Sequence, residues 1–240
     1  VDGRSVSVDV RGGALEQAER AEGTEIGLRV LIGRRQACVS ASDTSGRTIA
    51  EMAERAVAMA REAPEDPTVG LADPEDLARA WDLAALDLAD PAAEPGAATL
   101  EDDARRAEAA ALAIRGISQC QAASASYSRQ RIHLAASNGF AGGYSRTSRS
   151  TSAVAIAGEG LGMERDWAAE SRTYQSDLPS PEEIGTLAGT RAAERLGARK
   201  PRTGAWPVVF DERIAAGLIG HLLAAINGAA VVRGSSWLRD

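Results

Sequence analysis

The chain is poor in the side chains that most often carry catalysis. It has two histidines, His133 and His221, and two cysteines, Cys38 and Cys120, and none of them lies at the spacing of a zinc site or a redox motif. A zincin-type helical site is therefore excluded within this sequence. We expect each histidine to be a hydrogen-bonded structural residue. We expect each cysteine to be a buried thiol, as is usual in a reducing cytosol.

Lysine is almost missing, because Lys200 is the only lysine among 27 basic residues. It lies between Arg199 and Pro201 in a basic segment typical of an exposed linker, so lysine-base or Schiff-base chemistry is not expected. Acidic residues number 34, and the resulting net charge of −7 disfavours direct contact with nucleic acid.

Several common signatures are also missing. No apolar run is long enough to span a membrane, and the first residues do not have the apolar stretch of a signal peptide, so a cytoplasmic protein is expected. There is no Gly-x-Ser-x-Gly elbow and no Walker loop. The glycine-rich segment at 158–162 lacks the third glycine of a dinucleotide fingerprint and is expected to be a mobile loop.

What the sequence does contain is an α+β pattern with 44% hydrophobic residues, enough for a sizeable core. Alternating residues predict antiparallel strands at 6–10, 27–32, 36–40, 122–128, 132–137 and 142–157, with a turn at Gly33-Arg34-Arg35 between the second and the third. Helical spacing and capping residues predict helices starting near Thr48, Thr99, Ser180 and Ile214. A short helix at 74–81 and a buried strand at 206–210 are also predicted. The predicted fold has helices packed on one face of antiparallel sheets.

The same pattern divides the chain into four segments. An N-terminal α+β region at 1–66 is followed by a Pro-, Asp- and Ala-rich connection at 67–98. A central α+β region occupies 99–200. The segment 201–240 is too small to enclose a core of its own and is interpreted as the start of an incomplete C-terminal domain.

Hydroxyl side chains are concentrated in the strand predicted at 142–157, namely Ser145, Thr147, Ser148, Ser150, Thr151 and Ser152. They predict a sheet with one face in water. An ordinary solvated strand explains this pattern, and a docking surface is the alternative.

The neighbouring carboxylates Glu182 and Glu183 would suit acid–base chemistry. They follow Ser180 and Pro181, however, and carboxylates in a first helical turn stabilise the positive end of the helix dipole without any catalytic role. The residues by themselves therefore assign no active site.

Several segments in order along the chain resemble the TldD/PmbA family, also known as modulators of DNA gyrase. These are Gly27-Leu28-Arg29-Val30, Ser40-Ala41-Ser42-Asp43, Ser137-Asn138-Gly139-Phe140 with Tyr144 and Thr147, Met163 to Trp167, Asp177-Leu178, Arg195-Leu196-Gly197-Ala198, Pro207-Val208-Val209-Phe210 and Arg233-Gly234-Ser235-Ser236-Trp237-Leu238. The resemblance implies two N-terminal α+β regions and a larger third domain, which this chain only begins.

The resemblance also bears on catalysis. TldD-type members carry His-Glu-x-x-x-His, in which the two imidazoles hold zinc and the Glu activates water. The corresponding segment here starts at Asp211-Glu212 and places Ala216 at the second ligand position, where no metal can be coordinated. This departure resembles PmbA-like members, also called TldE-like. No catalytic, cofactor-binding or metal-binding residue is therefore assigned to this chain.

A PmbA/TldE-like member is expected to be a non-catalytic component of a metallopeptidase system that processes or degrades small peptides. Its expected partners are a TldD-type subunit that carries the zinc, or further copies of itself, and an unfolded peptide bound by strand addition. Two alternatives stay open. One is a regulator of DNA gyrase acting through protein contact, and the other is an independent peptidase with ligands beyond Asp240.

Overall fold

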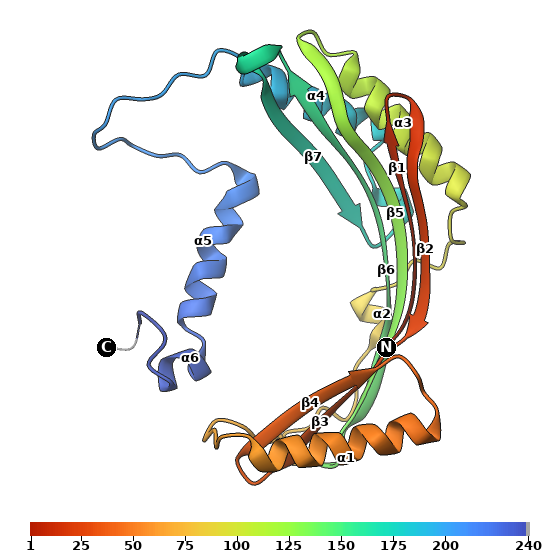
Figure 1. The fold of residues 1–240 in the computed structure, drawn as a ribbon, viewed down its shortest axis with the longest axis vertical. Coiled ribbons are helices and arrows are strands. Elements are labelled where there is room, and N and C mark those ends of the chain that lie inside the picture. The colour runs from red at the N-terminus through yellow and green to blue at the C-terminus, as the bar shows by residue number, and fades with distance from the viewer. Residues whose placement is uncertain (239–240) are drawn as a thin grey trace. The chain divides into compact units, whose positions relative to one another are not determined.

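The computed structural model describes residues 1–238 and divides into two compact units. Unit 1 comprises residues 1–65 and 69–198, and unit 2 comprises residues 66–68 with the chain from Arg199 onward. Both sheets and the first four helices belong to unit 1, whereas the last two helices belong to unit 2 (Figure 1). No helix among the described residues is long and apolar enough to cross a membrane.

The main sheet of unit 1 has five antiparallel strands in the order β2-β1-β5-β6-β7. The strands are β1 (Asp2–Arg11), β2 (Ala14–Thr24), β5 (Ile117–Ala135), β6 (Ala141–Ala157) and β7 (Glu164–Arg172). The sheet therefore joins strands from both sides of the predicted connection at 67–98.

Two helices, α3 (Ala97–Leu112) and α4 (Pro181–Glu194), lie together on one face of this sheet (Figure 1). The core beneath them is rich in small side chains: Ala107, Ala111, Cys120, Ala123, Ala153, Ala155, Ala157, Ala168, Ile184, Ala188 and Ala192. The opposite face of the sheet is covered by neither helix. The predicted α+β architecture, with helices on one face of an antiparallel sheet, is confirmed.

A second sheet consists of the hairpin β3 (Ile26–Ile32) and β4 (Arg35–Ala41), against which α1 (Gly46–Glu62) packs. The predicted turn at Gly33 is confirmed, and its positive φ of 59° explains the glycine. The helix begins earlier than predicted because Ser45, not Thr48, is the N-cap and accepts the amide of Thr48.

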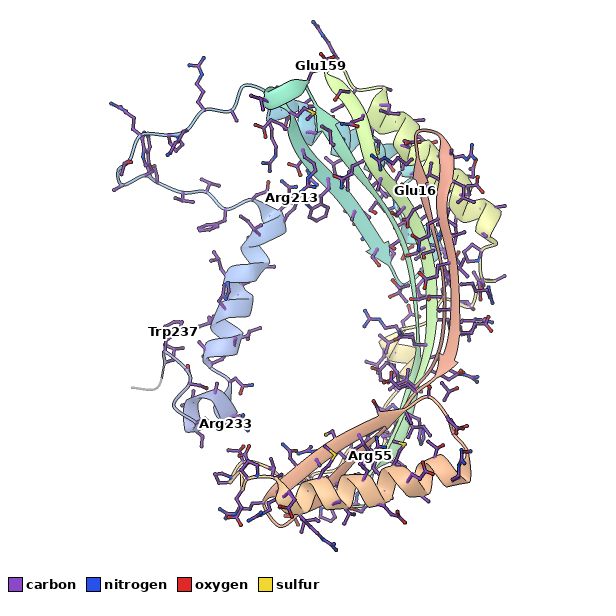
Figure 2. All side chains as sticks on the ribbon, in the orientation of Figure 1. Glu16, Arg55, Glu159, Arg213, Arg233 and Trp237 are labelled. Atoms are coloured by element: carbon purple, nitrogen blue, oxygen red, sulfur yellow. The ribbon has the colours of Figure 1, made fainter. Side chains whose placement is uncertain are left out.

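The strand predictions differ from the structure in two respects: two predicted strands are one continuous strand, and two further strands were not predicted. The strands predicted at 122–128 and 132–137 are parts of the single strand β5, because the polar residues between them continue the ladder. The strands β2 and β7 were missed. Every residue of the edge strand β2 is exposed, so neither of its faces needs apolar side chains. Its sequence therefore lacks the alternation of apolar and polar residues from which strands are predicted. Glu16 marks this strand in Figure 2.

The connection at 67–98 is attached to the main sheet around Asp90. The backbone amide of Asp90 donates to Thr147 Oγ1 at 2.8 Å, and its carboxylate accepts the amides of Ala92 and Gln175, each at 2.8 Å. The short helix predicted at 74–81 is wrong. The helix in this connection is α2 (Leu83–Leu86), where the side chain of Asp82 supplies the N-cap.

Unit 2 contains α5 (Glu212–Ala225) and α6 (Gly228–Val232). The buried strand predicted at 206–210 is wrong, because this segment is irregular and exposed, with Val209 96% exposed. A strand needs a neighbour for its backbone hydrogen bonds, and no described residue pairs with this segment.

Candidate functional site

The face of the main sheet opposite α3 and α4 is lined by serine side chains, and we call it the open face. Side chains alternate between the two faces of a strand. On β1, β5 and β6 the buried residues point toward the helices, so the partly exposed residues between them belong to the open face. The serines on this face are Ser5, Ser7, Ser124, Ser126, Ser128, Ser148, Ser150, Ser152 and Ser171.

The register places these serines side by side. Ser7, Ser126, Ser150 and Ser171 form one row across four strands. The hydroxyls of Ser126 and Ser150 are 2.7 Å apart, and those of Ser148 and Ser171 are 2.9 Å apart. A hydroxyl both donates and accepts, so this area can hydrogen-bond polar groups without imposing a charge.

One acidic side chain lies within this area. Asp9 on β1 accepts a hydrogen bond from the hydroxyl of Ser124 on β5, the residue directly opposite it. The sequence predicted a wet face from six hydroxyls of β6 alone, and this is right only for Ser148, Ser150 and Ser152, because Ser145, Thr147 and Thr151 point to the helix side, where the two threonines are each 1% exposed. The period-two serines of β1 and β5 carried the same signal, but the pairing of strands so distant in sequence was needed to bring them together.

An apolar corner lies at one end of the open face. Trp167 of β7 is opposite Val154 of β6, which is in turn opposite Ala122 of β5. Ile156 extends this patch along β6, and Trp167 is 48% exposed. The corner can receive an apolar side chain next to the hydroxyl-rich area.

The strands β2 and β7 are the edges of the sheet. An edge strand presents backbone N–H and C=O groups that can pair with another extended chain. The strand β2 carries Glu16, Glu19, Arg20 and Glu22 along its exposed length, and charges on an edge oppose such pairing. The strand β7 is charged as well, but it carries Trp167, Ala169 and Ser171 toward the open face, so it is the edge that adjoins the serine rows and the apolar corner, and it is the candidate for strand addition.

A buried ion pair supports the serine rows from the helix side. Arg149 of β6 is 4% exposed, and its guanidinium pairs with the carboxylate of Asp103 on α3. The same guanidinium donates to the carbonyl of Ser126 at 3.2 Å. Burial raises the pKa of Asp103 and lowers the pKa of Arg149, while their mutual attraction opposes both shifts.

Neither histidine belongs to the open face. His133 is exposed on β5, and His221 is exposed on α5 in the other unit. Neither makes a hydrogen bond or ion pair with another residue of the described chain. The prediction of hydrogen-bonded structural histidines is therefore wrong, since water can satisfy an exposed imidazole.

The cysteine prediction is half right. Cys120 is buried, its thiol contacts the carbonyls of Ala122 and Val154, and burial raises its pKa. Cys38 is exposed, which corrects the prediction of a buried thiol. Its neighbour Ala37 is the residue of this strand that is buried.

The paired carboxylates have structural roles. The helix start predicted at Ser180 is confirmed, and Ser180 and Glu183 in addition form a capping box there, in which Ser180 holds the pKa of Glu183 below its usual value. Glu182 accepts two hydrogen bonds from Arg106 on α3, which lower its pKa. Lys200 is exposed, as expected.

The glycine-rich segment expected to be a mobile loop contains a short 3-10 turn at Gly160–Gly162. It leads into β7 and not into a helix. The sequence reading of this segment as something other than a phosphate cradle agrees with that arrangement, because such a cradle precedes a helix N-terminus.

The segment at the expected zinc motif begins α5. Asp211 is the N-cap, and its carboxylate accepts the amide of Arg213 at 3.0 Å. Ala216 has no donor atom, so the residues of this segment do not fit a zinc ion. Over residues 1–238 no group of three or more His, Cys, Asp or Glu side chains is placed to hold a metal.

Comparison with protein families matches two parts of the chain. Residues 1–60 match the PmbA/TldA metallopeptidase domain 1, and residues 90–197 match the PmbA/TldA metallopeptidase central domain. Metalloprotease PmbA of Escherichia coli O157:H7 is 35% identical over 235 residues, which is 98% of this chain and 52% of the relative. A PmbA homolog of Haemophilus influenzae is 31% identical over 98% of this chain and 52% of its own length. The chain thus spans about half the length of the curated relatives it matches.

Solved structures share the fold. A candidate modulator of DNA gyrase from Bacteroides thetaiotaomicron has a TM-score of 0.87 at 23% identity, over 99% of this chain and 54% of its own. TldE from Thermococcus kodakarensis has a TM-score of 0.73 at 17% identity, over 99% of this chain and 53% of its own. At these identities the likeness concerns the fold.

Proposed function

Because the chain belongs to the PmbA/TldD metallopeptidase family, we propose that it is a peptide-holding, non-catalytic component of a cytoplasmic metallopeptidase system that processes or degrades small peptides. Its TldD-type partner supplies the zinc and the water-activating carboxylate. The activity belongs to the assembly, and this chain contributes substrate binding.

The observation that carries the proposal is the composition of the segment at Asp211–Ala216. One ligand position holds an aspartate that caps α5, and the other holds an alanine. Zinc in a peptidase needs several protein ligands and an open position for water. Ala216 provides none, so the two-ligand helical site of a zincin cannot form here.

The substrate in this proposal is an unfolded peptide that adds as a strand beside β7. Main-chain hydrogen bonds then give affinity regardless of sequence. The serine rows solvate the polar groups of the peptide, and the corner around Trp167 and Val154 receives its apolar side chains. A surface whose hydrogen-bonding groups are mostly hydroxyls suits a system that acts on peptides of varied sequence.

Unit 2 belongs, in this proposal, to a larger third domain of the intact protein. The helix α5 exposes apolar side chains on several sides: Ile214, Leu218, Ile219, Leu222, Leu223 and Ile226. These side chains form a continuous apolar surface and not scattered exposed residues, and such a surface is usually buried against another part of the protein. The curated relatives are about twice as long as this chain, which leaves enough sequence to supply that cover.

The test is zinc content and peptide hydrolysis of the intact protein, alone and mixed with its TldD-type companion. We expect hydrolysis only in the mixture, with zinc carried by the companion. Zinc binding and hydrolysis by the intact protein alone would overturn the proposal and place metal ligands beyond the described residues.

The mode of peptide binding is tested separately with peptides methylated at alternate backbone nitrogens. Strand addition uses only the N–H groups that point toward the sheet edge. Methylation of one alternate set should abolish binding, and methylation of the other set should be tolerated. Equal tolerance of both sets would exclude strand addition while leaving the non-catalytic role untouched.

A further inference from the structure

A pocket of about 400 Å³ lies on the main sheet near the start of β1, away from the open face. It is lined by Asp2, Gly3, Arg4, Glu22, Gly23, Arg129 and Arg131. Three guanidinium groups and two carboxylates give this lining a net charge of +1. The whole chain has a net charge of −7, so the pocket is a local exception.

Two of the three arginines are already neutralised. Arg4 pairs with Glu94 at 2.8 Å, and Arg131 pairs with Asp2 at 2.8 Å. The remaining carboxylate, Glu22, is engaged by Arg20. Each acidic side chain of the pocket therefore already pairs with an arginine other than Arg129.

Arg129 is different, because it makes no hydrogen bond or ion pair with another residue of the described chain. It is partly buried on β5, directly opposite Arg4 on β1. Like charges directly opposite each other on neighbouring strands destabilise a sheet. Glu94 offsets the charge of Arg4, whereas no described carboxylate pairs with Arg129, so a bound anion would neutralise the guanidinium of Arg129.

A second side chain without a hydrogen-bond partner lies on the same face of β5 as Arg129. Tyr127, two residues before Arg129, is 1% exposed, and its hydroxyl has no hydrogen-bond partner. Burial raises the pKa of this phenol, and the positive charges of Arg129 and Arg4 oppose the shift. The phenol is thus a neutral donor within electrostatic reach of both arginines.

From the unpaired Arg129, the facing Arg4 and the pocket between them, we infer that this site binds a small oxyanion. A guanidinium presents two parallel N–H groups that match a carboxylate or a phosphate. The site is separate from the open face, and the inference does not depend on the peptide-holding function. The oxyanion can be inorganic phosphate or the terminal carboxylate of a peptide.

The experiment is isothermal titration of the intact protein at fixed ionic strength with three probes. These are inorganic phosphate, N-acetylglycine with its free carboxylate, and N-acetylglycine amide, and the last two are too short to add as a strand beside β7. We expect saturable binding of phosphate or of the acid, and none of the amide. Binding of phosphate alone identifies a phosphate site, and binding of the acid alone identifies a chain-end site. Saturation by neither anion would overturn the inference.

The variant Arg129→Gln should weaken binding roughly 10- to 100-fold, as expected for loss of a hydrogen bond to a charged group. Arg34→Gln, which removes an exposed arginine from the β3–β4 turn, is the matched control and should bind as the unmodified protein does. Unchanged affinity in Arg129→Gln would sink the assignment.

Thermal unfolding separates a binding role from a structural one. In buffer without oxyanions, Arg129→Gln should unfold at the same temperature as the unmodified protein or higher, because it removes the repulsion with Arg4. The anion that binds in the titration should raise the midpoint of the unmodified protein and leave that of the variant unchanged. A lower midpoint for the variant without anions would show that Arg129 is structural.

Discussion

Gly185 of α4 lies so close to Ala107 of α3 that a Cβ on the glycine would meet the alanine carbonyl oxygen at 2.0 Å. Gly189, one turn further, lies similarly close to Ala111, where the distance would be 2.8 Å. The two helices therefore touch through their backbones. This contact fixes how tightly α3 and α4 can cover the alanine-rich core of the sheet.

Replacement of Gly185 by alanine should destabilise the protein by about 1–3 kcal/mol, because overpacking forces the helices apart. The loss is measured as the free energy of unfolding in urea. Gly46→Ala at the start of α1 is the control, since nothing lies within 4 Å of a Cβ there. Equal effects of the two substitutions would contradict the close packing described.

Glu108 should be essential to the β1–β2 hairpin. Its two carboxylate oxygens accept the amides of Gly12 and Gly13 at 2.6 and 2.7 Å, across 96 and 95 residues of sequence. Glu108→Ala should cost about 2–4 kcal/mol, because two amides lose a charged acceptor. Hydrogen exchange at both glycines should speed up. Glu101→Ala, at an exposed position of the same helix, should cost about 0.5 kcal/mol, and a similarly small loss for Glu108→Ala would count against this role.

Removal of one partner of the buried Arg149–Asp103 pair should destabilise the protein strongly. Arg149→Met leaves the carboxylate of Asp103 with Arg106 alone, whose guanidinium is 3.4 Å away, and a loss of about 2–3 kcal/mol is expected in urea unfolding. Further replacement of Asp103 by leucine should recover much of that loss. Arg105→Met removes an exposed i,i+4 pair with Glu101 and should change stability by less than about 1 kcal/mol. No recovery in the double variant would refute the pairing.

Acid should weaken the attachment of the 67–98 connection through Asp90. The amides of Gln175 and Ala92 hold the pKa of Asp90 below its usual range. The native state thus binds fewer protons than the unfolded state, so this contribution is complete above about pH 4 and is lost as pH falls through the native pKa. Asp90→Asn should be less stable than the unmodified protein at pH 6, and the difference should shrink toward pH 2.5. A difference that is constant with pH would exclude this linkage.

Trp167 should anchor the bound peptide at the apolar corner. In the proposed mode, Trp167→Ser should weaken binding of an unfolded peptide about tenfold, as is typical of a buried aromatic contact. Fluorescence anisotropy of a labelled peptide measures this. Leu161→Ser removes a fully exposed apolar side chain outside the open face and serves as the control. Equal affinities of the two variants would remove the corner from the binding surface.

Local chemistry made some features predictable. The helix start at Ser180 and the turn at Gly33 each depend on residues within a few positions of one another, and both are present. The buried strand predicted from the apolar segment at 206–210 was wrong, because a strand forms only beside a partner strand, which its own sequence does not specify.

Little of the candidate site could be predicted from the sequence. Its serines come from β1, β5, β6 and β7, and only the register brings Ser7 and Ser171 into one row. The partners of Arg149 and Asp90 lie 46 and 85 residues away, so no spacing rule could identify them. The absence of a zinc motif, by contrast, needed only the identity of Ala216.

The order of the strands also has a consequence for how the chain folds. The strands β5 and β6 form a hairpin around Asn138 and Gly139, whereas Asp2 of β1 meets Arg131 of β5 across 129 residues. Pairings between distant segments form slowly, because a large loop must close first. On the ribosome, β1 and β2 emerge long before β5. Val6, Val8 and Val10 of β1 are then exposed until Leu100, Ala104 and Ala125, which pack on them, have been synthesised, and apolar surface exposed in this way favours aggregation.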